Sequence, residues 1–150
     1  MSRFLFTVWP FTGHLHPALA MAEELSSRGH EIAFYSGADV QALAVRAGYE
    51  YFPFRNIDEE HSKSLLKAMS SIRNGAMSSI SQQMADLELI LATWQPDVIV
   101  CDMMMWAPIF VVHELYHIPV ASWSIPVGSL VFRPDQPPPL RSHRPCRWWR

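Results

Sequence analysis

The chain has 150 residues, of which 49% are hydrophobic and 17% are charged, and its formal net charge at pH 7 is -2. A chain of this length suits one domain, because it can bury roughly 70% of the surface that it would expose when unfolded. The apolar content excludes an intrinsically disordered chain, and the balanced charge excludes a general polyanion binder, so nucleic acid is not an expected partner.

The cysteines and the apolar stretches indicate a cellular location. Cys101 lies in an apolar run and Cys146 in an arginine-rich tail, so we expect no disulfide framework and a reducing compartment. The first apolar run ends before Pro10, which is too short for the core of a signal peptide. No stretch reaches the ~20 apolar residues of a membrane helix. We therefore expect a soluble, cytoplasmic protein without stable membrane insertion.

Five short apolar runs alternate with helical patterns along the chain. Their continuous apolar character is typical of parallel strands buried on both faces, and they cover residues 4–9, 30–35, 49–54, 98–101 and 117–123. Helices are predicted between them, over residues 17–28, 40–47, 61–94 and 106–116, with a break at 74–75 in the longest one. Right-handed crossovers then build an α/β, Rossmann-like doubly wound parallel sheet of strand order 3-2-1-4-5, with helices on both faces.

The segment from Pro10 to Pro17 joins the first predicted strand to the first predicted helix. We expect a loop that ends where Pro17 enters the first turn of the helix. Open α/β sheets bind their ligands at this carboxyl edge, which places His14 at the mouth of the sheet. Gly13 is the only glycine of the segment, so it is neither a three-glycine dinucleotide fingerprint nor a phosphate loop.

Asp102 ends the fourth predicted strand, which lies beside the first in this topology. His14 and Asp102 therefore end adjacent strands at one edge, although each alone is equally explained as a satisfied loop residue or a helix cap. Together they form a base and the carboxylate that orients it, with one ring nitrogen free to accept a proton. A hydrolase has little support without a Gly-x-Ser-x-Gly elbow, and His14 and His16 lack the further ligands of a metal site.

Three motifs resemble a known family. They are Gly13-His14-x-x-Pro17, the helix end Arg28-Gly29-His30-Glu31-Ile32, and residues 96–102 with the sequence Pro-Asp-Val-Ile-Val-Cys-Asp. With their spacing and strand order, they resemble the N-terminal half of the UDP-dependent glycosyltransferases of the GT-B fold, and most closely the bacterial macrolide-type enzymes. The resemblance covers roughly residues 3–139.

This resemblance implies an activity and a set of site residues. In that family the histidine deprotonates the acceptor hydroxyl and the aspartate orients it, and these roles fall here on His14 and Asp102. The sugar moves with inversion from a nucleotide-sugar co-substrate, without a metal or other cofactor. The N-terminal half supplies the pocket for a small apolar acceptor. Residues that could line it, although core packing explains them too, are Phe11, Gly13, Met103, Met104, Trp106 and the helices between Met69 and Met84.

The resemblance also predicts what this chain lacks. Residues 1–139 form the acceptor-binding domain, while the donor half of the family does not follow and residues 140–150 are a basic tail that departs from it, which suggests an out-of-frame extension. We therefore expect little or no transfer by this chain alone. The alternatives are a non-catalytic small-molecule binding module, a subunit that pairs with a separate donor subunit, and an unrelated Rossmann-like protein in which the His and Asp are structural.

Overall fold

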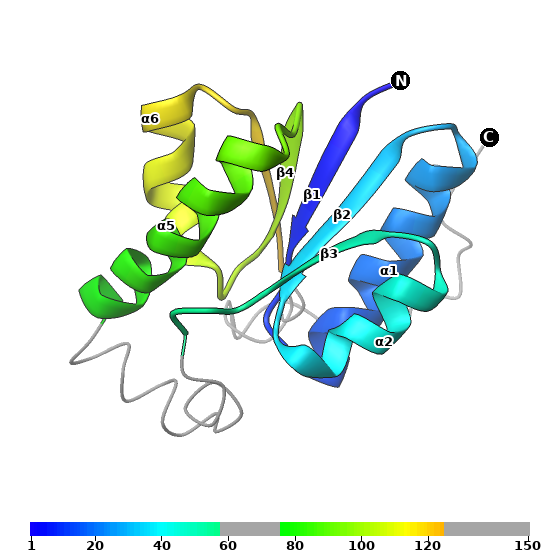
Figure 1. The fold of residues 1–150 in the computed structure, drawn as a ribbon, viewed down its shortest axis with the longest axis horizontal. Helices are drawn as coiled ribbons and strands as arrows, with labels where there is room; N and C mark the ends of the chain where they lie inside the picture. The colour runs from blue at the N-terminus through cyan, green and yellow to red at the C-terminus, as the bar shows by residue number, and fades with distance from the viewer. Residues whose placement is uncertain (58–75, 125–150) are drawn as a thin grey trace, which may run out of the picture.

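The computed structural model describes residues 1–57 and 76–124, which form a twisted sheet between two layers of helices (Figure 1). All strand pairs are parallel, and the spatial order is β3-β2-β1-β4-β5. The strands are β1 (Arg3–Thr7), β2 (Glu31–Ser36), β3 (Glu50–Pro53), β4 (Val98–Asp102) and β5 (Val120–Trp123). The predicted fold class and strand order are confirmed. The predictions made for residues 58–75 and 125–150, including the helix break, Met69 and the basic tail, lie outside the described residues.

The central strands are apolar on both faces, because helices cover both sides of the sheet. Phe6 of β1 lies opposite Phe34 of β2 and Val100 of β4, and all three are buried. The rings of Phe6 and Phe34 stack with their centroids 5.1 Å apart. Such continuous burial explains why the strands read as apolar runs rather than as alternating patterns.

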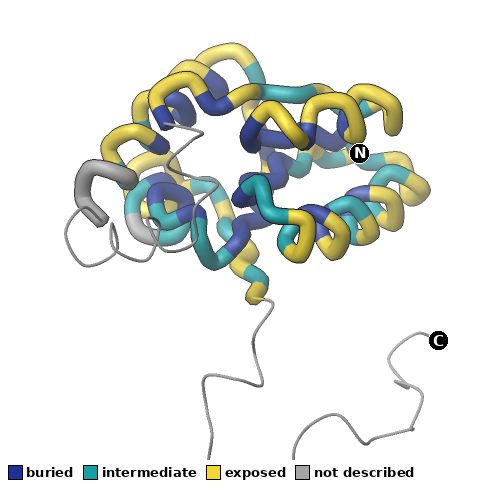
Figure 2. The backbone as a smooth tube through the Cα atoms, turned by 90° about the horizontal axis from the view of Figure 1, so that it is seen from below, coloured by how far each residue is buried: buried dark blue, intermediate teal, exposed yellow. Residues whose placement is uncertain are grey.

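In residues 1–57 and 76–124, helices cover both faces of the sheet (Figures 1 and 2). On one face lie α1 (Thr12–Ser27) and α2 (Ala38–Arg46), and α1 buries Leu15, Ala18 and Ala22 at helical spacing. On the other lie α5 (Ala76–Thr93) and a helix made of a π-helical turn, η1 (Pro108–Val112), followed by α6 (His113–Tyr116). In Figure 2 the buried backbone lies between these layers and the exposed backbone faces outward.

The first helix begins earlier than the sequence predicts. Helix α1 starts at Thr12 rather than at Pro17, because Phe11 has the extended backbone of an N-cap residue and its carbonyl accepts the Leu15 N–H at 2.9 Å. Pro17 has no N–H to donate to the Gly13 carbonyl one turn earlier. The helix tolerates this loss because Gly13 is exposed, so water can reach its carbonyl. His14 therefore lies in the first turn of α1 and not in a loop.

The last helix and strand also differ from the prediction in detail. The helix covers the expected residues 106–116, but its middle is the π-helical turn η1. His117 ends it in the left-handed conformation, with φ at 55°, so β5 begins only at Val120 rather than at 117. No helix within residues 1–57 and 76–124 is both long and apolar enough to cross a membrane.

Candidate active site

The two residues that the sequence predicts to meet lie in the first turn of α1, which follows β1, and at the carboxyl end of β4. Thr7, the last residue of β1, pairs with Cys101, so Asp102 lies one residue further along the neighbouring strand. The chain leaves β1 through Trp9 and enters α1, whose first turn returns His14 to the same edge. The Nδ1 atom of His14 lies 2.6 Å from Oδ2 of Asp102, so the predicted proximity is confirmed.

Asp102 is buried and is held by backbone donors. Oδ2 also accepts the Trp9 N–H at 3.0 Å, and Oδ1 accepts the Met104 N–H at 3.1 Å. These N–H groups stabilise the negative charge of a side chain that is only 1% exposed. An ionised carboxylate can only accept hydrogen bonds, so Nδ1 of His14 must donate the proton between them. In neutral His14 the Nε2 atom then carries the lone pair.

His14 is the solvent-facing member of the pair, with 17% of its side chain exposed. Within the described part of the chain, its Nε2 atom makes no hydrogen bond. Two aromatic rings lie near the imidazole: Phe11 at a centroid distance of 5.8 Å and Trp123 at 6.3 Å. The arrangement can take a proton at Nε2 from a group that enters beside these rings, while Asp102 stabilises the resulting imidazolium.

Sequence reasoning missed Trp123. It is the last residue of β5 and lies opposite Asp102 in the strand register. Its carbonyl accepts the Met103 N–H at 3.1 Å, which joins the segment after β4 to the end of β5. The predicted strand order would have placed Trp123 at the same edge as His14, so the signal was present in the topology.

The predicted acceptor-binding residues take different places at this edge. Phe11 contacts His14, and Met103 accepts the Trp106 Nε1–H at its carbonyl and the Ser124 hydroxyl at its sulfur, both at 3.1 Å. Gly13 is exposed on α1, where a side chain would meet no other atom within 4 Å. The side chain of Met104 packs against the core under α5, so its backbone N–H is the part that reaches Asp102.

Cys101 precedes Asp102 but does not supply a nucleophile. Its thiol is buried and contacts the carbonyls of Asp102 and Met105 at 3.2 and 3.0 Å. Burial raises the pKa of this thiol to about 12, so it stays protonated at neutral pH. In residues 1–57 and 76–124, no group of three or more His, Cys, Asp or Glu side chains could hold a metal ion.

Asp86 of α5 is a second buried carboxylate, on the other side of the sheet. It accepts hydrogen bonds from the Tyr35 hydroxyl at 2.8 Å, the Arg55 N–H at 2.9 Å, the Asn56 N–H at 3.2 Å and the Asn56 side-chain amide at 2.6 Å. Burial raises the pKa of Tyr35 above its ordinary value, and the charge of Asp86 raises it further. This cluster ties the segment after β3 to α5.

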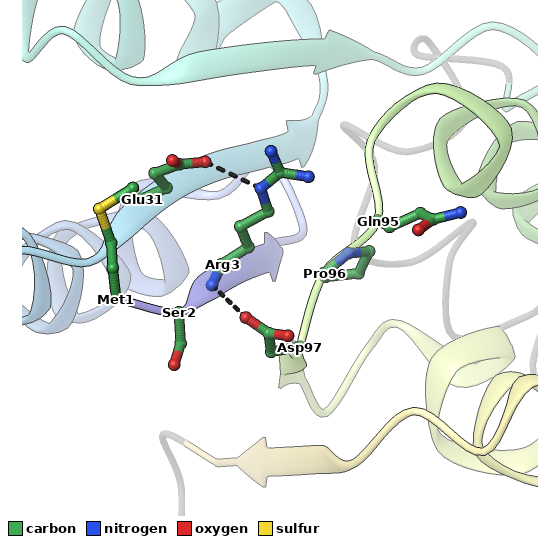
Figure 3. Close-up of a pocket in the computed structure, with 7 residues that line it drawn as sticks. All are labelled: Met1, Ser2, Arg3, Glu31, Gln95, Pro96 and Asp97. Atoms are coloured by element: carbon green, nitrogen blue, oxygen red, sulfur yellow. Dashed lines mark hydrogen bonds and ion pairs between the residues drawn. The ribbon is translucent and has the colours of Figure 1, made fainter.

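A polar cavity of about 470 Å³ opens at the opposite, amino-terminal edge of the sheet (Figure 3). Arg3 lies at its centre, with its backbone N–H on Asp97 at 2.7 Å and its Nε on Glu31 at 2.9 Å. These bonds join the starts of β1, β2 and β4. Parallel sheets bind their ligands at the carboxyl edge, so this cavity is not part of the His14 site.

The fold and the site thus define a Rossmann-like domain with a histidine and aspartate pair at the carboxyl edge of its sheet. No protein-family profile matches the chain. It is similar to 4'-demethylrebeccamycin synthase of Lentzea aerocolonigenes, with 28% identity over 93% of this chain and 35% of that protein. It is also similar to demethyllactenocin mycarosyltransferase of Streptomyces fradiae, with 40% identity over 32% of this chain and 10% of that protein.

The chain is also similar to solved structures of glycosyltransferases. Spinosyn rhamnosyltransferase SpnG matches 81% of this chain and 34% of its own, with a TM-score of 0.60 and 25% identity. The calicheamicin glycosyltransferase CalG4 matches 91% of this chain and 33% of its own, with a TM-score of 0.65; at 18% identity this likeness shows the fold alone. The chain is therefore similar to a fragment of glycosyltransferases of the GT-B fold, consistent with their N-terminal half, and spans about a third of the first relative's length.

Proposed function

We propose that this chain is the acceptor-binding part of a glycosyltransferase that moves a sugar from a nucleoside diphosphate to a hydroxyl of a small apolar molecule. The observation that carries the proposal is the hydrogen bond of 2.6 Å between His14 and Asp102 at the ligand-binding edge of the sheet. The names of the similar mycarosyltransferase and rhamnosyltransferase support the same reaction class. The expected cytoplasmic location is part of this proposal.

The proposed reaction uses His14 as the general base. Nε2 takes the proton of the acceptor hydroxyl as its oxygen attacks C1 of the sugar, and the bond from C1 to the diphosphate breaks with its electron pair. Attack opposite the leaving group inverts the configuration at C1. Asp102 keeps the Nδ1 proton in place and stabilises the imidazolium. Proton transfer to a base positioned as His14 is contributes typically about 10²- to 10⁴-fold in rate.

We assign the donor side of the reaction to the part of the relatives that this chain does not span. Solved neighbours are described as complexes with thymidine diphosphate, and one as a complex with the spinosyn aglycone. A thymidine diphosphate sugar therefore joins the expected uridine diphosphate sugar as a donor to test. We propose that the chain needs a donor half, from a longer protein or a separate subunit, to transfer sugar.

The test joins the chain to the donor half of a similar glycosyltransferase and measures sugar transfer from both donors. We expect His14→Gln to lower the rate by about 10²- to 10⁴-fold. His16→Gln, which changes an exposed residue of the same helix, is the matched control. Full turnover in the His14 variant would refute its role as the base. Acceptor binding without transfer, even with the donor half present, would favour a non-catalytic binding module.

The stereochemistry of the product is a separate test of the mechanism. Inversion predicts that the anomeric configuration of the glycoside is opposite to that of the donor, which the coupling of the anomeric proton in the NMR spectrum reports. A product with the donor's configuration would contradict a single displacement at C1.

A further inference from the structure

Resting on the proposed function, we infer that Trp123 is a further acceptor-binding residue and that the site selects acceptors with a flat aromatic ring beside the reacting hydroxyl. The inference begins from the strand register. Trp123 and Asp102 lie opposite each other at the ends of β5 and β4, so the indole and the carboxylate reach the same edge. The indole centroid is 6.3 Å from that of the His14 ring.

The backbone holds Trp123 firmly in this position. The β4 and β5 strands pair through four residues each, and beyond the last pair the Met103 N–H donates to the Trp123 carbonyl. The indole packs against the core cluster that contains Leu15 of α1. A ring fixed at a strand end loses little conformational entropy when a ligand stacks on it.

The polar atom of the indole is turned away from solvent. Nε1 of Trp123 is buried, and among the described residues it has no hydrogen-bond partner, although the residue as a whole is only partly buried. The exposed portion of Trp123 is therefore hydrocarbon and π surface. It can select a ligand by apolar contact and stacking but not by donating a hydrogen bond.

Phe11 supplies a second aromatic surface beside the imidazole. Its ring lies 5.8 Å from that of His14 and is partly buried. A hydroxyl that reaches the His14 imidazole therefore arrives near two aromatic rings. A planar aromatic ring attached to that hydroxyl can stack against them, whereas a saturated ring of the same size makes apolar contact only.

The test compares two probes that differ in planarity. Dissociation constants of the full 150-residue chain are measured for 2-naphthol and for trans-decahydro-2-naphthol by titration, with the His14 ring signals in the NMR spectrum as the readout. The selectivity is the ratio of the two constants. We expect Trp123→Leu to lower the selectivity for 2-naphthol by about 2- to 12-fold, the range of an aromatic pair interaction. Trp123→Phe should retain most of it.

The comparison between variants separates the ring from the hydroxyl. The two probes also differ in hydroxyl acidity, but that difference is the same in wild-type and variant protein. Trp94→Leu is the matched control, because it makes the same substitution at a partly buried tryptophan near Arg3 at the opposite edge. Its selectivity should equal that of the wild type.

Three results would overturn the inference. If both probes perturb His14 and the selectivity is unchanged in Trp123→Leu, the residue does not select the acceptor, while the acceptor site itself stands. If neither probe perturbs His14, the proposed acceptor site is wrong as well. Where Trp123→Leu does not fold, saturation transfer from 2-naphthol to the indole protons of Trp123 in the wild type decides. Binding without that transfer contradicts the inference.

Discussion

Asp102 and Asp86 are buried carboxylates on opposite faces of the sheet, and different hydrogen-bond donors stabilise each of them. Asp102 accepts two backbone N–H groups and the imidazole of His14, while Asp86 accepts two backbone N–H groups, an amide and the hydroxyl of Tyr35. His14, the partner of Asp102, has a partly exposed side chain at the carboxyl edge of the sheet. Tyr35 is fully buried. Asp102 therefore acts on a side chain at the carboxyl edge of the sheet, where ligands bind, whereas Asp86 stabilises the fold.

The largest expected effect on stability is at Asp86. Asp86→Ala leaves the buried Tyr35 hydroxyl without its acceptor and removes the hydrogen bonds from the exposed residues Arg55 and Asn56, which we expect to lower the free energy of unfolding by about 3 kcal/mol or more. Urea denaturation measures the change. Glu88→Gln, an exposed substitution on the same helix, should change it by less than about 0.5 kcal/mol. A loss at Asp86 as small as that of the control would contradict its role as a structural anchor.

Asp102→Asn tests the other carboxylate with a smaller cost in stability. The amide keeps one acceptor oxygen for a backbone N–H, so we expect a loss of about 1–3 kcal/mol. Its main effect should be on His14: an amide can donate to Nδ1, which moves the proton to Nε2. Nitrogen-15 NMR of the imidazole distinguishes the two tautomers. An Nδ1–H tautomer that survives in the variant would show that Asp102 does not set the proton position.

Tyr35→Phe removes one hydrogen bond to a charged group and should cost about 1.5–3 kcal/mol at neutral pH. The pKa of Tyr35 is raised above its ordinary value of about 10 in the folded protein, so the unfolded chain releases this proton first as pH rises. Wild-type stability therefore falls above about pH 10, and the variant should lack the part of this slope that Tyr35 contributes. Parallel stability curves for the two proteins at alkaline pH would contradict this assignment.

The smallest expected effect concerns the thiol beside Asp102. Cys101 should react with iodoacetamide at pH 8 only as fast as the fold opens, because burial holds its pKa at about 12. A Cys146→Ser background makes Cys101 the single thiol to be followed by mass spectrometry. Modification at the rate of a free cysteine would show that the carboxyl end of β4 is open to solvent.

The same comparison shows what the sequence could predict. The pairing of His14 with Asp102 follows from topology, since apolar runs identify the strands and the crossover rule orders them. The Asp86 cluster leaves no such signal, because it joins Tyr35, Asn56 and Asp86 through side-chain hydrogen bonds that no periodicity encodes. The early start of α1 was missed for a local reason: Pro17 is typical of a first turn, but the backbone of Phe11 decides where the helix begins.

The donors that hold Asp102 have a consequence for how such a domain can diversify. They are main-chain groups of Trp9 and Met104, so any residue other than proline at these two positions supplies the same N–H. Both side chains contact the apolar core, so the size and shape of an apolar residue at positions 9 and 104 can change without removing the N–H groups that keep the base aligned. At these two residues the side chain can vary while the backbone N–H keeps its role.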